Sequence, residues 1–318
     1  MPLHPFLQQT LDAAAAAGSL PYYDMATMAE VRAAALAGNP PPPQPVAVAA
    51  VADLLIPASP QAIPARVYHP PGEGPHPAVV YFHGGGFVAL GLDSHDSICR
   101  RLCVGAGCLV VSVDYRLAPE HRFPAATDDA LAATRWVAAN AAVLGADTKR
   151  LFVAGDSAGA CLAAVTAMVL RDLGGLSLAG QLLFYPVTDH PSGSPTSYRR
   201  YATGVGLTDQ TMRWFWDQYL ATPAQAAEPA ASPLRMLSCA GLPPAFVMVA
   251  EYDVLREEGE AFAQRLAQAA VPMHLRCSVG MNHGFLKHAG ALAEAAAELD
   301  EACFWLRRVS GIGEPSGV

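Results

Sequence analysis

The stretch LFVAGDSAGACLAAV (151–165) constrains the fold more than any other part of the sequence. It starts as an apolar strand, passes through Gly-Asp-Ser-Ala-Gly, and ends in small and apolar residues at helical spacing. Because Gly155 and Gly159 lack Cβ atoms, the chain can turn sharply there and lift the side chain of Ser157 above a sheet. A glycine-rich turn with a helix-capping serine is the alternative, but the apolar strand before the turn and the apolar helix after it favour an exposed nucleophile.

Short apolar runs predict the central sheet. They lie at 77–82, 108–113, 150–155, 179–185, 244–250 and 272–279, mostly separated by segments of helical periodicity. Strands that are apolar throughout are covered on both faces, which is typical of a parallel sheet between two layers of helices. Two earlier runs, 46–57 and 62–68, predict a hairpin or meander at one sheet edge. The predicted fold class is α/β, with a mostly parallel central sheet.

Composition and charge exclude several classes of protein. Of the 318 residues, 52% are hydrophobic and 15% charged, as expected of one main globular domain with insertions. A net charge of −8 without a basic run argues against a nucleic-acid partner, and no apolar stretch predicts a membrane span. The N-terminus carries no early Lys or Arg, so we expect a cytoplasmic protein.

The cysteines predict neither disulfides nor a metal centre. Seven are scattered along the chain without a CxxC pair. Cys99 and Cys103 lie four residues apart, and we interpret them as reduced, partly buried thiols. No metal and no cofactor is expected.

Two regions lie outside the strand and helix pattern. Residues 1–45 hold helical stretches and end in the proline run 40–43, which predicts a stiff connector. Residues 188–233 include the aromatic stretch TMRWFWDQYL. Insertions of this kind usually lie over the strand ends where ligands bind. We therefore expect a two-part cap over a catalytic domain formed by 46–187 and 234–318.

The loop HGGGF (83–87) directly follows a predicted strand. Consecutive glycines let backbone N–H groups approach a reacting carbonyl and stabilise its oxyanion. Gly84, Gly85 and Ala158 are the predicted donors. A phosphate-binding loop is the alternative, but no GxGxxG or GK[ST] pattern is present. His83 is interpreted as a residue that supports the loop.

A serine nucleophile needs a base, and in this fold class the chain order is Ser, acid, His. His283 lies on a loop after the last apolar run, whereas His274 lies inside a predicted strand. His288 is one helical turn further on and is interpreted as a solvated helix residue. His283 is the predicted base.

Three carboxylates could orient that histidine. Asp253 follows the run 244–250 and precedes His283 by 30 positions. Glu251 and Asp189 also follow predicted strands and remain rivals. We favour Asp253.

At this point the sequence resembles the hormone-sensitive-lipase-like branch of the α/β-hydrolase superfamily, the bacterial family IV carboxylesterases. The motifs that carry the resemblance are HGGGF (83–87), DYRLAPEHRFP (114–124), GDSAG (155–159), EYDVLREEGE (251–260) and NHGF (282–285). The resemblance implies Ser157 as nucleophile, His283 as base and Asp253 as orienting acid. It also implies an oxyanion hole from Gly84, Gly85 and Ala158, and a helical cap. A polar network of Asp114, Tyr115, Arg116 and Glu120 is implied as structural; no role for Asp156 follows.

The implied activity is hydrolysis of short- to medium-chain acyl esters, small molecules, through an acyl-enzyme. Amidase, lactonase or deacetylase activity is the nearer alternative, and a non-enzymatic small-molecule receptor the remote one, because such receptors lack a complete triad. Candidate pocket residues are Phe87, Leu207, Trp214, Phe215 and Phe285. A homodimer through the run 272–279 is compatible with the resemblance.

Overall fold

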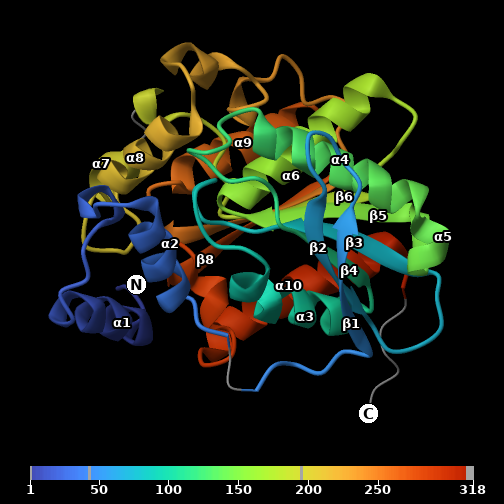
Figure 1. The fold of residues 1–318 in the computed structure, drawn as a ribbon, viewed down its shortest axis with the longest axis horizontal. Helices are drawn as coiled ribbons and strands as arrows, with labels where there is room; N and C mark the ends of the chain where they lie inside the picture. The colour runs from blue at the N-terminus through green and yellow to red at the C-terminus, as the bar shows by residue number, and fades with distance from the viewer. Residues whose placement is uncertain (1, 42–43, 194–195, 313–318) are drawn as a thin grey trace.

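The computed structural model describes residues 2–41, 44–193 and 196–312. Within these residues the chain forms one eight-stranded sheet, in the order β1-β2-β4-β3-β5-β6-β7-β8 (Figure 1). The strands are β1 (Ala50–Ile56), β2 (Ile63–His69), β3 (His76–Phe82), β4 (Leu109–Val113), β5 (Ala146–Asp156), β6 (Gly180–Phe184), β7 (Ala245–Tyr252) and β8 (Met273–Asn282). Each contains or overlaps one of the predicted apolar runs.

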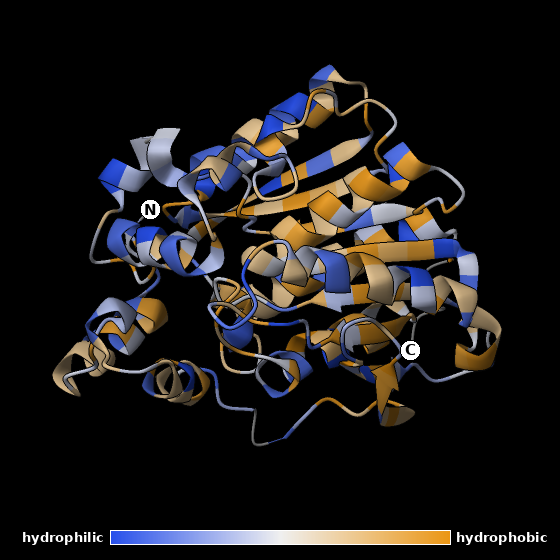
Figure 2. Cartoon of the chain, turned by 45° about the horizontal axis from the view of Figure 1, so that its top comes forward, coloured by the Kyte–Doolittle hydropathy of each residue, from blue (hydrophilic) through white to orange (hydrophobic). Residues whose placement is uncertain are grey.

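The sheet is parallel from β4 through β3 to β8, and β1 and β2 form an antiparallel hairpin at its edge. In its centre, Val80 lies opposite Val111 on one side and Val153 on the other. All three side chains are fully buried. Figure 2 shows the central strands as bands of hydrophobic residues. The predicted α/β fold class is confirmed.

Successive side chains of a strand point to opposite faces of the sheet. Both sets are apolar here, and helices cover each face. On one face Val79 and Tyr81 pack with α3 (Leu92–Ala106) and α10 (Ala293–Ser310). On the other face Val80 packs with α4 (Ala125–Ala139), α6 (Ala158–Leu173) and α9 (Arg256–Gln268). Figure 1 shows these two layers on opposite sides of the sheet. The short α5 (Ala141–Leu144) leads into β5.

The N-terminal segment and the insertion after β6 lie together at one end of the molecule. The first forms α1 (Pro5–Ala16), η1 (Tyr22–Asp24) and α2 (Met28–Ala37); the second forms η2 (Pro191–Gly193), α7 (Thr196–Arg200), α8 (Asp209–Tyr219), η3 (Pro223–Ala227) and η4 (Pro233–Arg235). In Figure 1 α1 and α2 lie on the same side as α7 and α8. The ring of Tyr22 packs against Phe215 at 5.8 Å and Trp214 at 6.4 Å, which joins the two regions.

The connector after α2 is only partly described. Gly38 caps α2 and Pro40 and Pro41 follow, whereas the rest of the predicted proline run, positions 42–43, lies outside the described residues.

Every cysteine is a free thiol in this structure, and six of the seven are buried. Among the residues described, no helix has the length and apolar character needed to cross a membrane. Residues 2–41, 44–193 and 196–312 also hold no cluster of three His, Cys, Asp or Glu side chains suited to a metal ion.

Candidate active site

Ser157 occupies the sharp turn between β5 and α6. Its backbone has φ 56° and ψ −120°, a conformation that few non-glycine residues adopt. The flanking glycines are required by space: a Cβ on Gly159 would overlap the carbonyl of Phe82, and a Cβ on Gly155 would overlap the backbone of Gly159. The Ser157 N–H donates to the Phe184 carbonyl at 2.9 Å, which fixes the turn on the neighbouring strand. The turn therefore has the form that the sequence predicts.

Three side chains that are distant in sequence meet at this turn. The Nε2 atom of His283 lies 2.9 Å from the Ser157 Oγ, and its Nδ1 atom lies 2.7 Å from Asp253 Oδ2. Asp253 follows β7, is buried, and accepts a second hydrogen bond from the Leu255 N–H at 2.9 Å. A carboxylate that holds the Nδ1–H tautomer leaves Nε2 free to take the serine proton. The structure thus brings together the three residues that the sequence singled out.

The rival carboxylates have other partners. Glu251 Oε2 accepts a hydrogen bond from the Gly280 N–H at 2.7 Å. Asp189 pairs with Arg235 at 2.5 Å. The rival histidine His274 lies on β8, 3.9 Å from Glu301. Asp253 is therefore the acid whose contact supports an orienting role.

His288 differs from its interpretation as a solvated helix residue. It ends the short helix η5 (Phe285–His288), is partly buried, and lines the same cavity as Ser157. Burial and the nearby Lys287 lower the pKa of His288 to about 4. The imidazole is therefore neutral near pH 7.

The glycine loop is offset by one residue from the prediction. The Gly84 N–H does not face the cavity but donates to Asp156 Oδ1 at 3.0 Å. Gly85 and Gly86 line the cavity, at φ 112° and 63°, and their N–H groups have no acceptor in the described part of the chain. Ala158 begins α6 as expected. The geometry favours Gly85, Gly86 and Ala158 over the predicted set with Gly84.

Asp156 fixes the position of this loop through its contact with the Gly84 N–H. Its carboxylate also accepts a hydrogen bond from the Tyr81 hydroxyl at 2.8 Å and lies 3.1 Å from His95 Nε2. Burial by itself raises the pKa of the Asp156 carboxyl, but His95 and the Tyr81 hydroxyl hold that pKa below its ordinary value. A Cβ on Gly84 would lie 2.5 Å from Asp156 Oδ2, so this position requires glycine.

Removing the Asp156 carboxylate frees the glycine loop. We expect Asp156→Ala to lower kcat by about 10- to 100-fold with little change in KM, because the oxyanion donors lose their fixed position. Asp156→Asn keeps one acceptor oxygen and is expected to retain most of the wild-type kcat. Steady-state kinetics on a chromogenic ester measure both variants, with circular dichroism as the folding control. Wild-type kcat in folded Asp156→Ala would show that the loop needs no such anchor.

A second polar network supports the strand end beside the loop. Tyr115 donates from its hydroxyl to the His83 carbonyl at 2.7 Å and stacks on the His83 ring at 4.3 Å. The ring of His83 in turn contacts the Gly84 carbonyl through Nδ1 at 2.7 Å, which agrees with its interpretation as loop support.

The other members of that network reach further. Arg116 pairs with Asp129 at 2.7 Å, and Glu120 pairs with Arg32 of α2 at 2.6 Å. Asp114 lies 3.8 Å from His83 Nε2. The resemblance implied a structural role for these residues, and their contacts agree with it.

Ser157 and His283 line a cavity of about 490 Å³, the catalytic cavity. Its walls include Leu11 and Tyr22 from the N-terminal segment. Of the predicted pocket residues, Leu207 and Phe215 line this cavity. Leu11 and Tyr22 were not predicted as cavity residues, because the sequence of a helix does not indicate which part of the fold its faces contact.

The remaining predicted pocket residues lie elsewhere. Phe87 is buried in the core and stacks on Tyr219 at 3.8 Å, and Phe285 is buried beside Tyr185. Trp214 is partly buried and packs outside the cavity against Tyr22. Phe87 and Phe285, the aromatic residues of the HGGGF and NHGF motifs, are therefore core residues and do not line the cavity.

Comparisons with known proteins agree with this geometry. Residues 79–287 match the family described as the alpha/beta hydrolase fold. The chain belongs to this α/β-hydrolase family, in its hormone-sensitive-lipase-like branch. It is 43% identical over 263 residues to Esterase LipI of Mycobacterium tuberculosis, covering 81% of this chain and 82% of that one. It is 42% identical over 239 residues to ethyl acetate hydrolase of Pseudomonas putida, covering 73% and 74%.

Solved α/β-hydrolase structures superpose over nearly the whole chain. An enzyme from the metagenome of Lake Arreo has a TM-score of 0.91 at 38% identity, covering 97% of this chain and 99% of that one. The hyperthermophilic esterase of Pyrobaculum calidifontis has a TM-score of 0.88 at 40% identity, covering 98% and 99%. With relatives of this kind, the chain is a carboxylic ester hydrolase that uses a serine.

Proposed function

We propose that Ser157, His283 and Asp253 are the catalytic triad of this esterase. The observation that supports it is the chain of contacts at 2.9 and 2.7 Å through the two imidazole nitrogens. His283 takes the Ser157 proton as Oγ attacks the ester carbonyl, and the resulting oxyanion accepts hydrogen bonds from the N–H groups of Gly85, Gly86 and Ala158.

Collapse of the tetrahedral intermediate breaks the carbonyl–alkoxy bond. The His283 imidazolium gives its proton to the leaving alcohol, and Ser157 keeps the acyl group. Water then attacks this acyl-enzyme with His283 again as base, which releases the carboxylic acid and restores the serine. Asp253 stays ionised and stabilises the imidazolium in both halves of the cycle.

We propose residues 1–45 and 188–233 as the cap of the enzyme and residues 46–187 and 234–318 as its catalytic domain. Both parts of the cap contribute walls to the catalytic cavity, through Tyr22 and Phe215 among others. A cavity of about 490 Å³ with walls from both parts of this cap favours short- to medium-chain acyl groups. The similarity to ethyl acetate hydrolase supports small esters.

A series of p-nitrophenyl esters tests the acyl length. We expect the highest kcat/KM on acetyl or butyryl esters and a fall of about tenfold or more on the palmitoyl ester, because a long acyl chain fits a cavity of this size poorly. The assays contain no detergent, and each ester is used below the concentration at which it aggregates. Differences in kcat/KM then reflect the acyl length alone. Fastest turnover of the palmitoyl ester would reject the proposed limit.

Amidase, lactonase and deacetylase reactions would use the same catalytic residues. Measuring kcat/KM on anilides and lactones with the same acyl groups would rank these activities against ester hydrolysis. The cytoplasmic location and a homodimer through β8 remain predictions; β8 is an edge strand that exposes Leu275 and Val279.

A further inference from the structure

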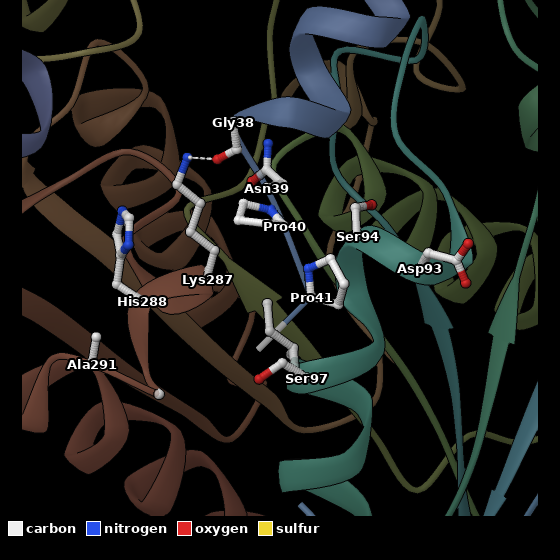
Figure 3. Close-up of a pocket in the computed structure, with 12 residues that line it drawn as sticks. Gly38, Asn39, Pro40, Pro41, Asp93, Ser94, Ser97, Lys287, His288 and Ala291 are labelled. Carbon is white, nitrogen blue, oxygen red and sulfur yellow. Dashed lines mark hydrogen bonds between the residues drawn. The ribbon is translucent and has the colours of Figure 1, made fainter. Parts of the chain in front are cut away.

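Figure 3 shows the lining of a second cavity of about 250 Å³, here called the side cavity. It lies between the segment after α2, the first turns of α3 and η5. Asn39, Ile98, Lys287 and His288 line both cavities, so these four residues form the boundary between them. The catalytic cavity therefore extends from Ser157 to this boundary.

Lys287 is the only lysine or arginine among the described residues that line the catalytic cavity, and desolvation lowers the pKa of its ammonium group below its ordinary value. Its amino group donates to the Gly38 carbonyl at 3.2 Å, the contact drawn in Figure 3. No carboxylate of the described residues forms an ion pair with it. The sequence has only two lysines, Lys149 and Lys287, among 20 basic residues.

Neighbouring acidic groups are already engaged. Asp93 lines the side cavity, but its carboxylate pairs with Arg66 at 2.8 Å. Asp156 lines the catalytic cavity and is held by Tyr81, Gly84 and His95. The adjacent His288 is neutral near pH 7 because its pKa is lowered to about 4. Lys287 thus lines both cavities, and no carboxylate of residues 2–41, 44–193 and 196–312 is its counter-ion.

We propose that Lys287 is a specificity-determining residue that binds a carboxylate of the substrate at the boundary of the two cavities. The preferred substrates are then half-esters of short dicarboxylic acids, whose free carboxylate pairs with Lys287 while Ser157 attacks the ester. A cation without a counter-ion at the wall of a cavity attracts an anion, and a carboxylate accepts charge-assisted hydrogen bonds from the ammonium group. The proposal rests on Ser157 as the nucleophile.

The alternative is that Lys287 only holds the segment after α2 through Gly38. That role affects charged and neutral esters alike, whereas a binding role changes their ratio. Monoethyl glutarate and ethyl hexanoate form a matched pair of substrates, because they have similar length and differ in charge.

The test measures kcat/KM for both esters at pH 7 in wild type, Lys287→Met and Lys287→Arg, with Lys149→Met as the matched control. We expect Lys287→Met to lower the ratio of monoethyl glutarate to ethyl hexanoate by about tenfold. Lys287→Arg restores much of the ratio, and Lys149→Met leaves it unchanged. An unchanged ratio in Lys287→Met overturns the proposal, whether both rates fall or neither does.

Binding without turnover separates this proposal from the assignment of the nucleophile. Calorimetric titration of Ser157→Ala with monoethyl glutarate, with and without Lys287→Met, is expected to show about tenfold weaker binding in the double variant. Equal binding in the two proteins overturns the role of Lys287. If wild type hydrolyses neither ester but the binding difference persists, the assigned activity fails and the carboxylate site stands.

Discussion

We expect Ser157→Ala to lower kcat by about 10⁴- to 10⁶-fold, because loss of the nucleophile removes the covalent route and leaves only the oxyanion hole and substrate binding. Substrate binding persists, since the substitution removes one oxygen and leaves the cavity walls in place. The measurement is single-turnover hydrolysis of p-nitrophenyl butyrate at high enzyme concentration.

The control for that variant is its fold. Circular dichroism and thermal unfolding are expected to match wild type, because Ala158 and Gly159 still begin α6. A folded Ser157→Ala protein with activity within tenfold of wild type would exclude Ser157 as the nucleophile.

Asp253→Asn is expected to lower kcat by about 10⁴-fold, because an amide at this position favours the wrong imidazole tautomer and does not stabilise the imidazolium. Asp253 is buried and contacts His283 Nδ1 at 2.7 Å, so the substitution acts directly on the base. Steady-state kinetics with an active-site titration measure the effect.

The two rival carboxylates are matched controls. Glu251→Gln removes a charge two residues away, and Asp189→Asn breaks a partly exposed ion pair with Arg235. Both are expected to keep kcat within about fivefold of wild type. A larger loss in either variant than in Asp253→Asn would move the orienting role to that residue.

The strands were predictable because each buried parallel strand is a short apolar run with a turn after it. Only the bounds differ. β5 begins at Ala146, earlier than the predicted run at 150, because its polar start pairs with β3 at His76. β8 continues to Asn282, where it pairs with Tyr252 of β7. Polar residues at a strand end carry no apolar signal.

The candidate triad was predictable for the same reason. Ser157 and Asp253 follow parallel strands at their carboxyl ends, which meet at one sheet edge, and His283 follows the last strand. The chain order and the turn chemistry then restrict the choice to a few residues.

Contacts between distant segments were not predictable. Asp156 is adjacent to the nucleophile in sequence, but its partners Gly84 and Tyr81 lie 72 and 75 residues away. The offset of the oxyanion loop follows from that contact. The amino group of Lys287 is held by a hydrogen bond to the Gly38 carbonyl, 249 residues away in the sequence. Side chains whose function depends on such packing leave no periodic pattern.

Covalent trapping with diethyl p-nitrophenyl phosphate tests the catalytic assignment most directly. Attack by the serine oxygen on phosphorus releases p-nitrophenol and leaves a stable phosphoryl adduct that mimics the tetrahedral intermediate. We expect one adduct per chain, located on Ser157 by peptide mass spectrometry, with loss of activity in proportion to labelling and no label in Ser157→Ala. Complete inactivation with the label on another residue, or equal labelling of Ser157→Ala, would contradict the proposed triad.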